Sequence, residues 1–291
     1  MIYSYTNKRI FCILLLYFSS LTAQKVSITN NTNEPLTLKS GGKDIILNGG
    51  RKTEITDVKS GISFKNEKNL NRYINLFLEP AQKLNLSVNS DYAFIYDGDQ
   101  APVHEYINEK LNVETFGKIK DYVNAIEKRN FSELKNSSEI TLSNILKNIN
   151  IRSIMPLKTE SEAIQNMKNY VKYNWLNTIF TAISKQKDKE FSRVAINYYY
   201  KQYIEQDIST YRCNNYYHYK TIEILAANKS LLQINLPTYP IIGKTDDDKI
   251  NQFLPKSCQK LYFSNKYNYL EHINSPQKDY YKKILDEKFN Y

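Results

Sequence analysis

The stretch INLFLEPAQKLNLSV (residues 74–88) comes shortly before the point where the sequence pattern changes from strands to helices. Apolar residues alternate on both sides of Pro80, with Leu76 and Leu78 before it and Leu84 and Leu86 after it. Side chains two positions apart lie on one face of a strand, so each run can bury one face in a common core. Proline cannot donate a hydrogen bond to a neighbouring strand, which favours a turn at Pro80. The stretch therefore predicts a β-hairpin.

The stretch YDGDQAPVHEYINEKLN (residues 96–112) follows and predicts the start of a helix. Asp99 is a candidate cap, and Pro102 falls in the first turn, where a missing N–H costs little. The apolar residues that then share one helical face are Val103, Tyr106, Ile107 and Leu111. Because the connection is too short to act as a free linker, we expect this helix to pack on the strands.

Upstream of this join, short runs of alternating residues recur about every 8 to 12 positions. They are KVSIT, PLTL, DIIL, TEITDV, GISF, YINLFL, KLNLSV and YAFIY. Clusters of Gly, Asn, Ser and Asp separate them, and six of the eight glycines lie between residues 41 and 98. This pattern predicts a small antiparallel β-sandwich or barrel over residues 24–98.

Downstream of the join, residues 99–291 have a helical period of apolar residues almost throughout. Three predicted stripes are Phe116, Ile119, Val123 and Ile126; Leu142, Ile145, Leu146 and Ile149; and Phe191, Val194, Ala195, Tyr198 and Tyr199. Such stripes are typical of packing surfaces between helices. The fold class expected is therefore α+β, with a small β-domain followed by a mostly α-helical region.

The first 23 residues have the features of a secretory signal peptide. Lys8 and Arg9 precede an apolar run from Ile10 to Phe18, and small residues follow up to Ala23. The apolar run is shorter than the roughly 20 residues that a membrane-spanning helix needs, although an uncleaved anchor is the alternative. We expect cleavage near Ala23 and a mature protein that is periplasmic or secreted and not membrane-spanning.

The formal net charge of +10 becomes +8 when Lys8 and Arg9 leave with the signal. Lysine and arginine are dispersed among acidic residues along the chain instead of forming one arm or stripe. This dispersal argues against nucleic acid as a partner, and so does the predicted export of the protein. The charge fits a solvated surface with a codon bias towards Lys, Asn, Ile and Tyr, or an acidic partner in the cell envelope.

Three cysteines occur, and Cys12 lies inside the apolar run, so it should leave with the signal. Cys213 and Cys258 remain, in a compartment where disulfides persist. The sequence leaves two alternatives open, a single bridge between them or a pair of unrelated buried thiols.

The order of features resembles the region upstream of the catalytic domain in secreted TlpA-like thiol-disulfide oxidoreductases of the Bacteroidota type. Three stretches carry the resemblance: LFLEPAQKLNLSV, IYDGDQAPVHEYINEK and KEFSRVAINYYYKQYI. They are similar to a strand-Glu-Pro-strand hairpin of the β-domain, to its last strand with the first helix, and to a later helix of the middle region. The resemblance covers roughly residues 25–270 and implies a signal, a β-domain and a helical region.

The chain departs from that family at the residues that carry its chemistry. Such enzymes use a Cys-x-x-Cys pair, in which a helix N-terminus lowers the pKa of one thiol and the other thiol resolves the mixed disulfide. No Cys-x-x-Cys occurs here, because Cys213 and Cys258 are 45 positions apart. The family's thioredoxin domain is expected after the helical region, so no catalytic residue carries over. A truncated or split oxidoreductase stays an alternative.

Other catalytic and metal-binding patterns are missing or weak. Ser-x-x-Lys occurs at Ser40, Ser184 and Ser257, but without the companion motifs of that hydrolase class. The three histidines show no ligand spacing, and DDD at residues 246–248 lacks the alternation of a calcium loop. We expect no catalytic residues, no cofactor and no metal site.

The densest local signal is YYYKQYIEQDISTYRCNNYYHYK, residues 198–220. Tyrosine combines a large apolar ring with a polar hydroxyl, so such a cluster suits recognition of a peptide or glycan. The residues of this candidate surface are Tyr200, Tyr203, Tyr211, Arg212, Tyr216, Tyr217 and Tyr219. The alternative, which the helical stripe favours, is packing between helices with hydroxyls that reach water.

These observations lead to two functional expectations. The first is an exported, non-catalytic binding or accessory module whose partner is another envelope protein, a peptide or a glycan. The alternative is a redox-associated protein that acts through Cys213 and Cys258, or a split thioredoxin-like oxidoreductase.

Overall fold

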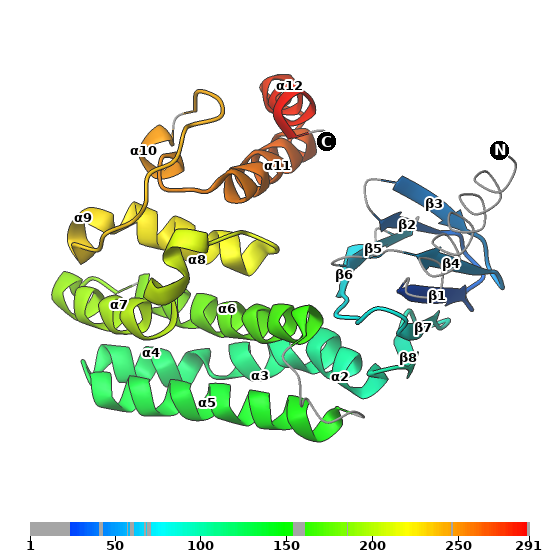
Figure 1. Cartoon of the computed structure of the whole chain (residues 1–291), viewed down its shortest axis with the longest axis horizontal. Helices are drawn as coiled ribbons and strands as arrows, with labels where there is room; N and C mark the ends of the chain where they lie inside the picture. The colour runs from blue at the N-terminus through cyan, green and yellow to red at the C-terminus, as the bar shows by residue number, and fades with distance from the viewer. Residues whose placement is uncertain are drawn as a thin grey trace, which may run out of the picture. The chain divides into compact units, whose positions relative to one another are not determined.

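The computed structural model describes residues 24–40, 43–56, 58, 61–66, 68, 71–153, 161–184, 186–245 and 247–289. The predicted signal peptide and Asp246 lie outside these residues. The chain forms two compact units. Unit 1 comprises residues 1–111 with 147–167, and unit 2 comprises residues 112–146 with 168–291. The strands of unit 1, coloured blue to cyan, and the helices of unit 2 are labelled in Figure 1.

Unit 1 is built on two four-stranded sheets that share one core. Sheet A has the order β4-β1-β7-β8 and sheet B the order β3-β2-β5-β6. The strands are β1 (Lys25–Asn30), β2 (Leu36–Ser40), β3 (Lys43–Leu47), β4 (Lys52–Thr56), β5 (Gly61–Asn66), β6 (Asn71–Asn75), β7 (Lys83–Val88) and β8 (Phe94–Gly98). Each strand overlaps one predicted run, and the α+β class with an N-terminal β-sandwich is confirmed.

Alternation along each strand fills the core between the sheets. Leu84, Leu86 and Val88 of β7 are fully buried while Asn85 is exposed, as the half-buried pattern requires. The rings of Phe64 and Phe94 meet edge to face with centroids 4.8 Å apart, which joins sheet B to sheet A. The sandwich is therefore held by side chains of both inner faces.

The predicted hairpin at residues 74–88 is wrong, because β6 and β7 belong to different sheets. The chain leaves sheet B after Asn75 and enters sheet A at Lys83. Leu76 and Leu78 are buried in the shared core without pairing to β7, and residues 80 and 81 form a turn as Pro80 predicts. The alternation of apolar residues predicted correctly which side chains are buried, but it does not indicate which sheet each strand joins.

Within sheet A, β7 instead pairs in parallel with β1, the N-terminal strand. Val26 lies opposite Leu84 and Ile28 opposite Leu86, so both strands present the same apolar face. The other strand pairs among the described residues are antiparallel, and β7 forms its hairpin with β8.

The first helical segment, α2 (Ala101–Glu105), runs directly into the π-helical turn η1 (Tyr106–Lys110). The residues of the predicted apolar face, Val103, Tyr106, Ile107 and Leu111, are all buried. Asp99 does not cap this helix as predicted; its Oδ2 accepts from the Lys83 N–H at 2.8 Å, and Gln100 occupies the N-cap position. The Asp99 carboxylate therefore bonds the backbone at the start of β7 instead of capping the helix.

The same helical segment covers the outer edge of β6, which is an edge strand of sheet B. The side-chain amide of Asn108 accepts from the Asn75 N–H at 2.8 Å and donates to the Asn75 carbonyl at 3.0 Å. His104 Nε2 accepts from the Phe77 N–H at 3.0 Å. Unpaired strand edges invite pairing with other chains, and here helix side chains satisfy the edge. The expectation that the first helix packs on the strands is confirmed.

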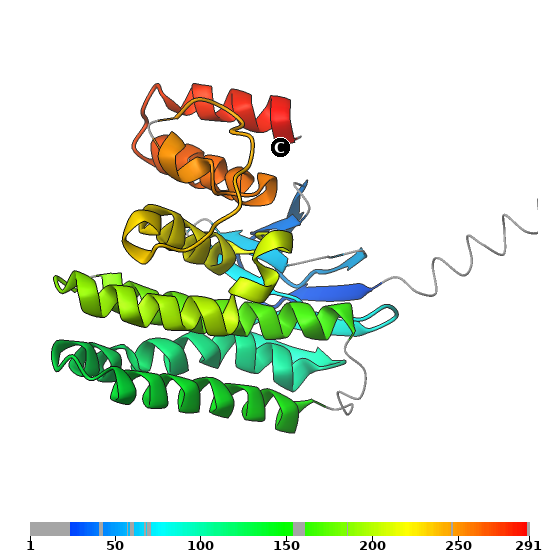
Figure 2. The ribbon, with the colours of Figure 1, turned by 60° about the vertical axis from the view of Figure 1, so that its left-hand side comes forward.

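Unit 2 is helical and has one large aromatic-rich core. Its elements are α3 (Leu111–Gly117, from its second residue), α4 (Ile119–Glu127), α5 (Phe131–Arg152), α6 (Glu162–Ser184), α7 (Lys189–Tyr203), the 3-10 turn η2 (Glu205–Thr210), α8 (Tyr216–Ala227), α9 (Lys229–Leu232), α10 (Asp248–Asn251), α11 (Lys256–His272) and α12 (Lys278–Phe289). The end of α5 and the start of α6 belong to unit 1. Figure 2 shows α11 and α12 side by side at the C-terminal end of the unit.

The central helix of unit 2 is α6, in which every residue from 173 to 180 is buried. Burial on all sides is expected only for a helix surrounded by others. Its Trp175 is fully buried and donates its indole N–H to the Ser138 carbonyl at 2.8 Å. Two residues of the predicted apolar stripes are exposed instead of packed. Phe116 is 43% exposed because α3 ends at Gly117, and Val194 of α7 is 42% exposed.

Candidate functional site

Cys213 and Cys258 form a disulfide whose Cα atoms are 4.9 Å apart, which decides between the two alternatives that the sequence left open. Cys213 lies in the short segment between η2 and α8, and Cys258 lies in the first turn of α11. The Cys213 N–H donates to the Ser257 hydroxyl at 3.0 Å, so the residue next to Cys258 also holds the other half of the bridge. The bond closes a loop with a sequence separation of 45.

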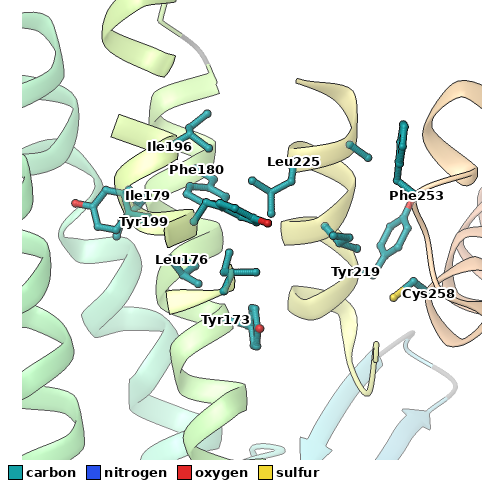
Figure 3. Close-up of a cluster of buried hydrophobic side chains, with 14 of the residues drawn as sticks. Tyr173, Leu176, Ile179, Phe180, Ile196, Tyr199, Tyr219, Leu225, Phe253 and Cys258 are labelled. Carbon is teal, nitrogen blue, oxygen red and sulfur yellow. The ribbon is translucent and has the colours of Figure 1, made fainter. Parts of the chain in front are cut away.

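The disulfide is part of the core of unit 2 and not of its surface. Cys258 has no exposed area and Cys213 is 7% exposed. Figure 3 shows Cys258 beside Tyr219, within a cluster of buried side chains. A thiolate that attacks a disulfide needs access to one sulfur, so this packing restricts exchange.

The structure divides the residues of the candidate tyrosine surface into three groups. Tyr200, Tyr211 and Tyr219 are buried in the core, which excludes them from an exposed surface. Tyr203 and Tyr217 are partly buried against it. Arg212 and Tyr216 are exposed. The cluster is therefore mainly a packing element, as the helical stripe of the sequence favours, and the seven residues do not form one surface.

The buried hydroxyls of this segment bond to the protein itself. Tyr211 donates to the His218 carbonyl at 2.7 Å and Tyr200 to the Asn235 carbonyl at 3.2 Å. Tyr219 donates to the Glu223 carboxylate. Burial raises the pKa of Tyr211 and of Tyr219 well above that of a free tyrosine, and the Glu223 carboxylate adds to the effect on Tyr219. These phenols remain protonated donors.

A second group of tyrosines surrounds a carboxylate on α5. Tyr198 and Tyr203 of α7 both donate to Glu139 Oε1, the latter at 3.1 Å. Burial, with the Glu139 carboxylate in addition, raises the pKa of Tyr198 to about 12. Lys135 lies over the Tyr198 ring at 4.9 Å from its centroid. These two hydrogen bonds to one carboxylate oxygen link α5 to α7.

His218, at the start of α8, lies close to the disulfide in sequence and is 4% exposed. Its Nδ1 accepts from the Asn214 N–H at 3.2 Å, so the neutral ring carries its proton on Nε2. Burial lowers the pKa of His218 to about 3, and the Lys172 ammonium acts in the same direction. A histidine with this pKa stays neutral at physiological pH and does not shuttle protons there.

Other residues that the sequence singled out have structural partners or stand apart. Asp248 Oδ1 accepts from the Thr245 N–H at 2.9 Å, and Asp247 accepts from the Tyr262 hydroxyl at 2.7 Å, which fits a local turn. Ser257 is engaged by Cys213. Within the described part of the chain no group of three or more His, Cys, Asp or Glu residues is arranged to hold a metal ion.

Sequence reasoning missed the helix side chains that bond the β6 edge, His104 and Asn108. It also missed the close approach of Tyr73 to Gly61 on sheet B, where a Cβ atom added to Gly61 would lie 2.5 Å from Tyr73 Cζ. Neither has a motif, because each depends on the register of strands that are distant in sequence. The four-residue spacing of His104 and Asn108, which places them on one helical face, is the only signal that pointed to the first contact.

The structure defines a two-unit α+β protein, with a β-sandwich in one unit and a disulfide-closed helical core in the other. No protein-family model matches the chain, and no match was found among curated proteins. None of the helices in the described residues is long and apolar enough to cross a membrane.

Proposed function

We propose that the protein is an exported, non-catalytic binding or accessory module, similar in organisation to the non-catalytic part of a TlpA-like thiol-disulfide oxidoreductase. The leader-like first 23 residues and the order of β-domain and helical region support this proposal. The bridge between Cys213 and Cys258 fits an oxidising compartment.

The observation that carries the proposal is the burial of the disulfide. Redox-active disulfides present at least one sulfur to a partner thiolate, whereas structural ones are packed away from it. Here Cys258 has no exposed area and Cys213 only 7%. The bridge thus holds α11 against the start of α8, and a partner would bind elsewhere, on the surface of the protein.

Export and redox inactivity are tested separately. For export, the full chain is produced in a Gram-negative host, and the intact mass of the periplasmic protein is measured. Loss of about 23 residues supports the proposal, while a full-length protein in the membrane fraction contradicts it. For redox inactivity, the periplasmic protein is assayed for dithiol-dependent reduction of a disulfide substrate, with a thioredoxin as the positive control.

A second candidate function is a redox role for the same bridge, favoured by one observation. Cys258 lies in the first turn of the 17-residue helix α11, where the helix dipole stabilises a thiolate and so makes it a better leaving group. An incoming thiolate would then attack the Cys213 sulfur. Turnover in the reductase assay that disappears in Cys213→Ser would favour this function over the first.

A further inference from the structure

The turn between β3 and β4 has the sequence Asn48-Gly49-Gly50-Arg51. The Arg51 N–H donates to the Asn48 carbonyl at 3.1 Å, and Gly50, unlike Gly49, has a positive φ, of 67°. A turn with this bond and a positive φ at its third residue is of type II, which favours glycine there. The turn carries the chain from sheet B, which contains β3, to sheet A, which contains β4.

This turn contains the one Asn-Gly pair of the sequence, Asn48 with Gly49. The side-chain carbonyl carbon of an asparagine can be attacked by the main-chain nitrogen of the next residue, which closes a five-membered ring. Glycine at the next position favours this attack because it has no side chain to obstruct it and leaves the backbone free to turn. Asparagine is among the chemically labile residues of proteins for this reason.

Both reacting groups of the pair are available in the folded protein. Asn48 is exposed. Among the described residues, neither its side-chain amide nor the Gly49 N–H has a hydrogen-bond partner. The hydrogen bonds of the turn use other atoms, namely the Asn48 main-chain carbonyl and the Gly50 N–H, which donates to the Asn30 carbonyl at 2.7 Å. The fold therefore ties down neither the nitrogen that attacks nor the amide that is attacked.

A second pair in the same unit, Asp97 with Gly98, shows the opposite arrangement. The Asp97 carboxylate accepts from the Asn85 side-chain amide at 3.0 Å. Gly98 lies in β8, where it is paired with Leu84 of β7. Because the side chain of one partner and the backbone of the other are both held there, the fold restrains the same ring closure. The structure thus singles out Asn48.

We propose that Asn48 is a site of spontaneous deamidation. The Gly49 nitrogen bonds to the Asn48 side-chain carbonyl carbon, the bond from that carbon to the amide nitrogen breaks, and ammonia leaves with the proton that Gly49 gives up. Water then opens the resulting succinimide at either of its two carbonyl groups, which yields aspartate or isoaspartate. No oxidant, reductant or enzyme is needed. The inference concerns a covalent modification and goes beyond the proposed binding role.

The isoaspartate product should disturb the crossing between the two sheets. In that product the main chain runs through the former side chain and gains one carbon, while the Asn48 carbonyl that accepts from Arg51 becomes a free carboxylate. The turn has no room for the longer path, because even a Cβ atom added to Gly49 would lie 2.5 Å from the Thr32 carbonyl oxygen. The aspartate product keeps the original main chain and should be tolerated.

The test follows the modification in the purified protein during incubation in mildly alkaline buffer, with an unincubated sample as reference. Trypsin cuts after Lys43 and Arg51 and releases the peptide DIILNGGR, residues 44–51. Chromatography with mass spectrometry separates its asparagine, aspartate and isoaspartate forms, and labelling by an isoaspartyl methyltransferase identifies the last. We expect conversion at a rate within about threefold of that in the urea-unfolded protein. Conversion slowed more than about tenfold by folding overturns the inference.

Two variants separate the chemistry from its structural effect. Asn48→Gln keeps an amide but requires a larger ring, so no modified peptide should form; equal conversion there would contradict the proposed ring closure. Asn48→Asp reproduces the aspartate product and should melt close to the natural protein, whereas the incubated natural protein should lose several degrees of melting temperature. An equal loss in incubated Asn48→Gln would assign it to another residue and overturn the structural consequence.

Discussion

Asn108 bonds the backbone of Asn75 through both atoms of its side-chain amide, as a neighbouring strand would do with its peptide group. The same amide donates to the His104 carbonyl at 2.9 Å, one turn earlier in the helical segment. The π-helical turn η1 contains Asn108, and such turns often re-aim side chains at specific partners. One residue thus links the helix to the edge of sheet B.

We expect Asn108→Ala to lower the free energy of unfolding by about 1–3 kcal/mol, because the N–H and carbonyl of Asn75 lose their partner. Asn124→Ala is the matched control, since Asn124 is an exposed asparagine of α4, and it should change stability by less than about 0.5 kcal/mol. Urea unfolding monitored by circular dichroism measures both. Equal effects in the two variants would show that the edge contact contributes nothing.

His104 makes the stability of unit 1 depend on pH. Its Nε2 accepts from the Phe77 N–H and its Nδ1 donates to the Gln100 carbonyl at 2.9 Å, so the buried ring is neutral. Burial lowers the pKa of His104 to about 4, against about 6.5 for the unfolded chain. Between these values the unfolded state binds more protons, so stability falls as the pH falls from about 6.5 towards 4, by on the order of 3 kcal/mol.

The measurement is the free energy of unfolding at several pH values for the natural protein and for His104→Gln. Subtracting one profile from the other cancels the contributions of the carboxylates and of His218 to the pH dependence. The lowered pKa of His218 acts in the same direction as that of His104. We expect this difference to shrink as the pH falls through the window. His272→Gln, at an exposed position on α11, serves as the control for replacing a histidine outside the core. A difference that is constant with pH would contradict the buried neutral state.

The sequence predicted the strands and the apolar helix faces well, because burial follows local periodicity. Leu76, Leu78 and Leu84 are all buried as the alternation indicates, yet the strands around them are in different sheets. That choice is set by the parallel pairing of β7 with β1, nearly 60 positions away, and no local pattern encodes it. Asp99 was misassigned for a similar reason, since its partner is the distant Lys83 backbone.

The candidate site was predicted in part. The two cysteines outside the predicted signal allow only one intramolecular pair, so the sequence named the candidate pair but left open whether the two are bonded, and it gave no indication that the bridge is buried. The tyrosines could not be divided into buried and exposed by spacing alone, because Tyr211, in the non-helical segment before α8, is buried and Tyr216, in its first turn, is exposed. Gly61 and Tyr73 required the register of β5 against β6.

Breaking the disulfide should destabilise unit 2 without releasing an activity. For a loop with this separation of 45, the chain-entropy model assigns up to about 4 kcal/mol, and the melting temperature should fall by several degrees in Cys213→Ser with Cys258→Ser. Because both sulfurs are packed in the core, mild reductant should leave the natural protein unalkylated. Intact mass after alkylation under native and denaturing conditions checks this, and two freely alkylated thiols in the native protein would refute the structural role.

The tyrosine segment offers a test that separates packing from recognition within one residue type. Tyr211 is 6% exposed and its hydroxyl bonds the His218 carbonyl, while Tyr216, five positions later, is 50% exposed. Tyr211→Phe removes one donor from a buried carbonyl and should lower the free energy of unfolding by about 1–2 kcal/mol. Tyr216→Phe should change it by less than about 0.5 kcal/mol. Urea unfolding of both variants decides between them. If Tyr211→Phe is as harmless as Tyr216→Phe, the buried hydrogen bond to the His218 carbonyl does not stabilise the segment before α8.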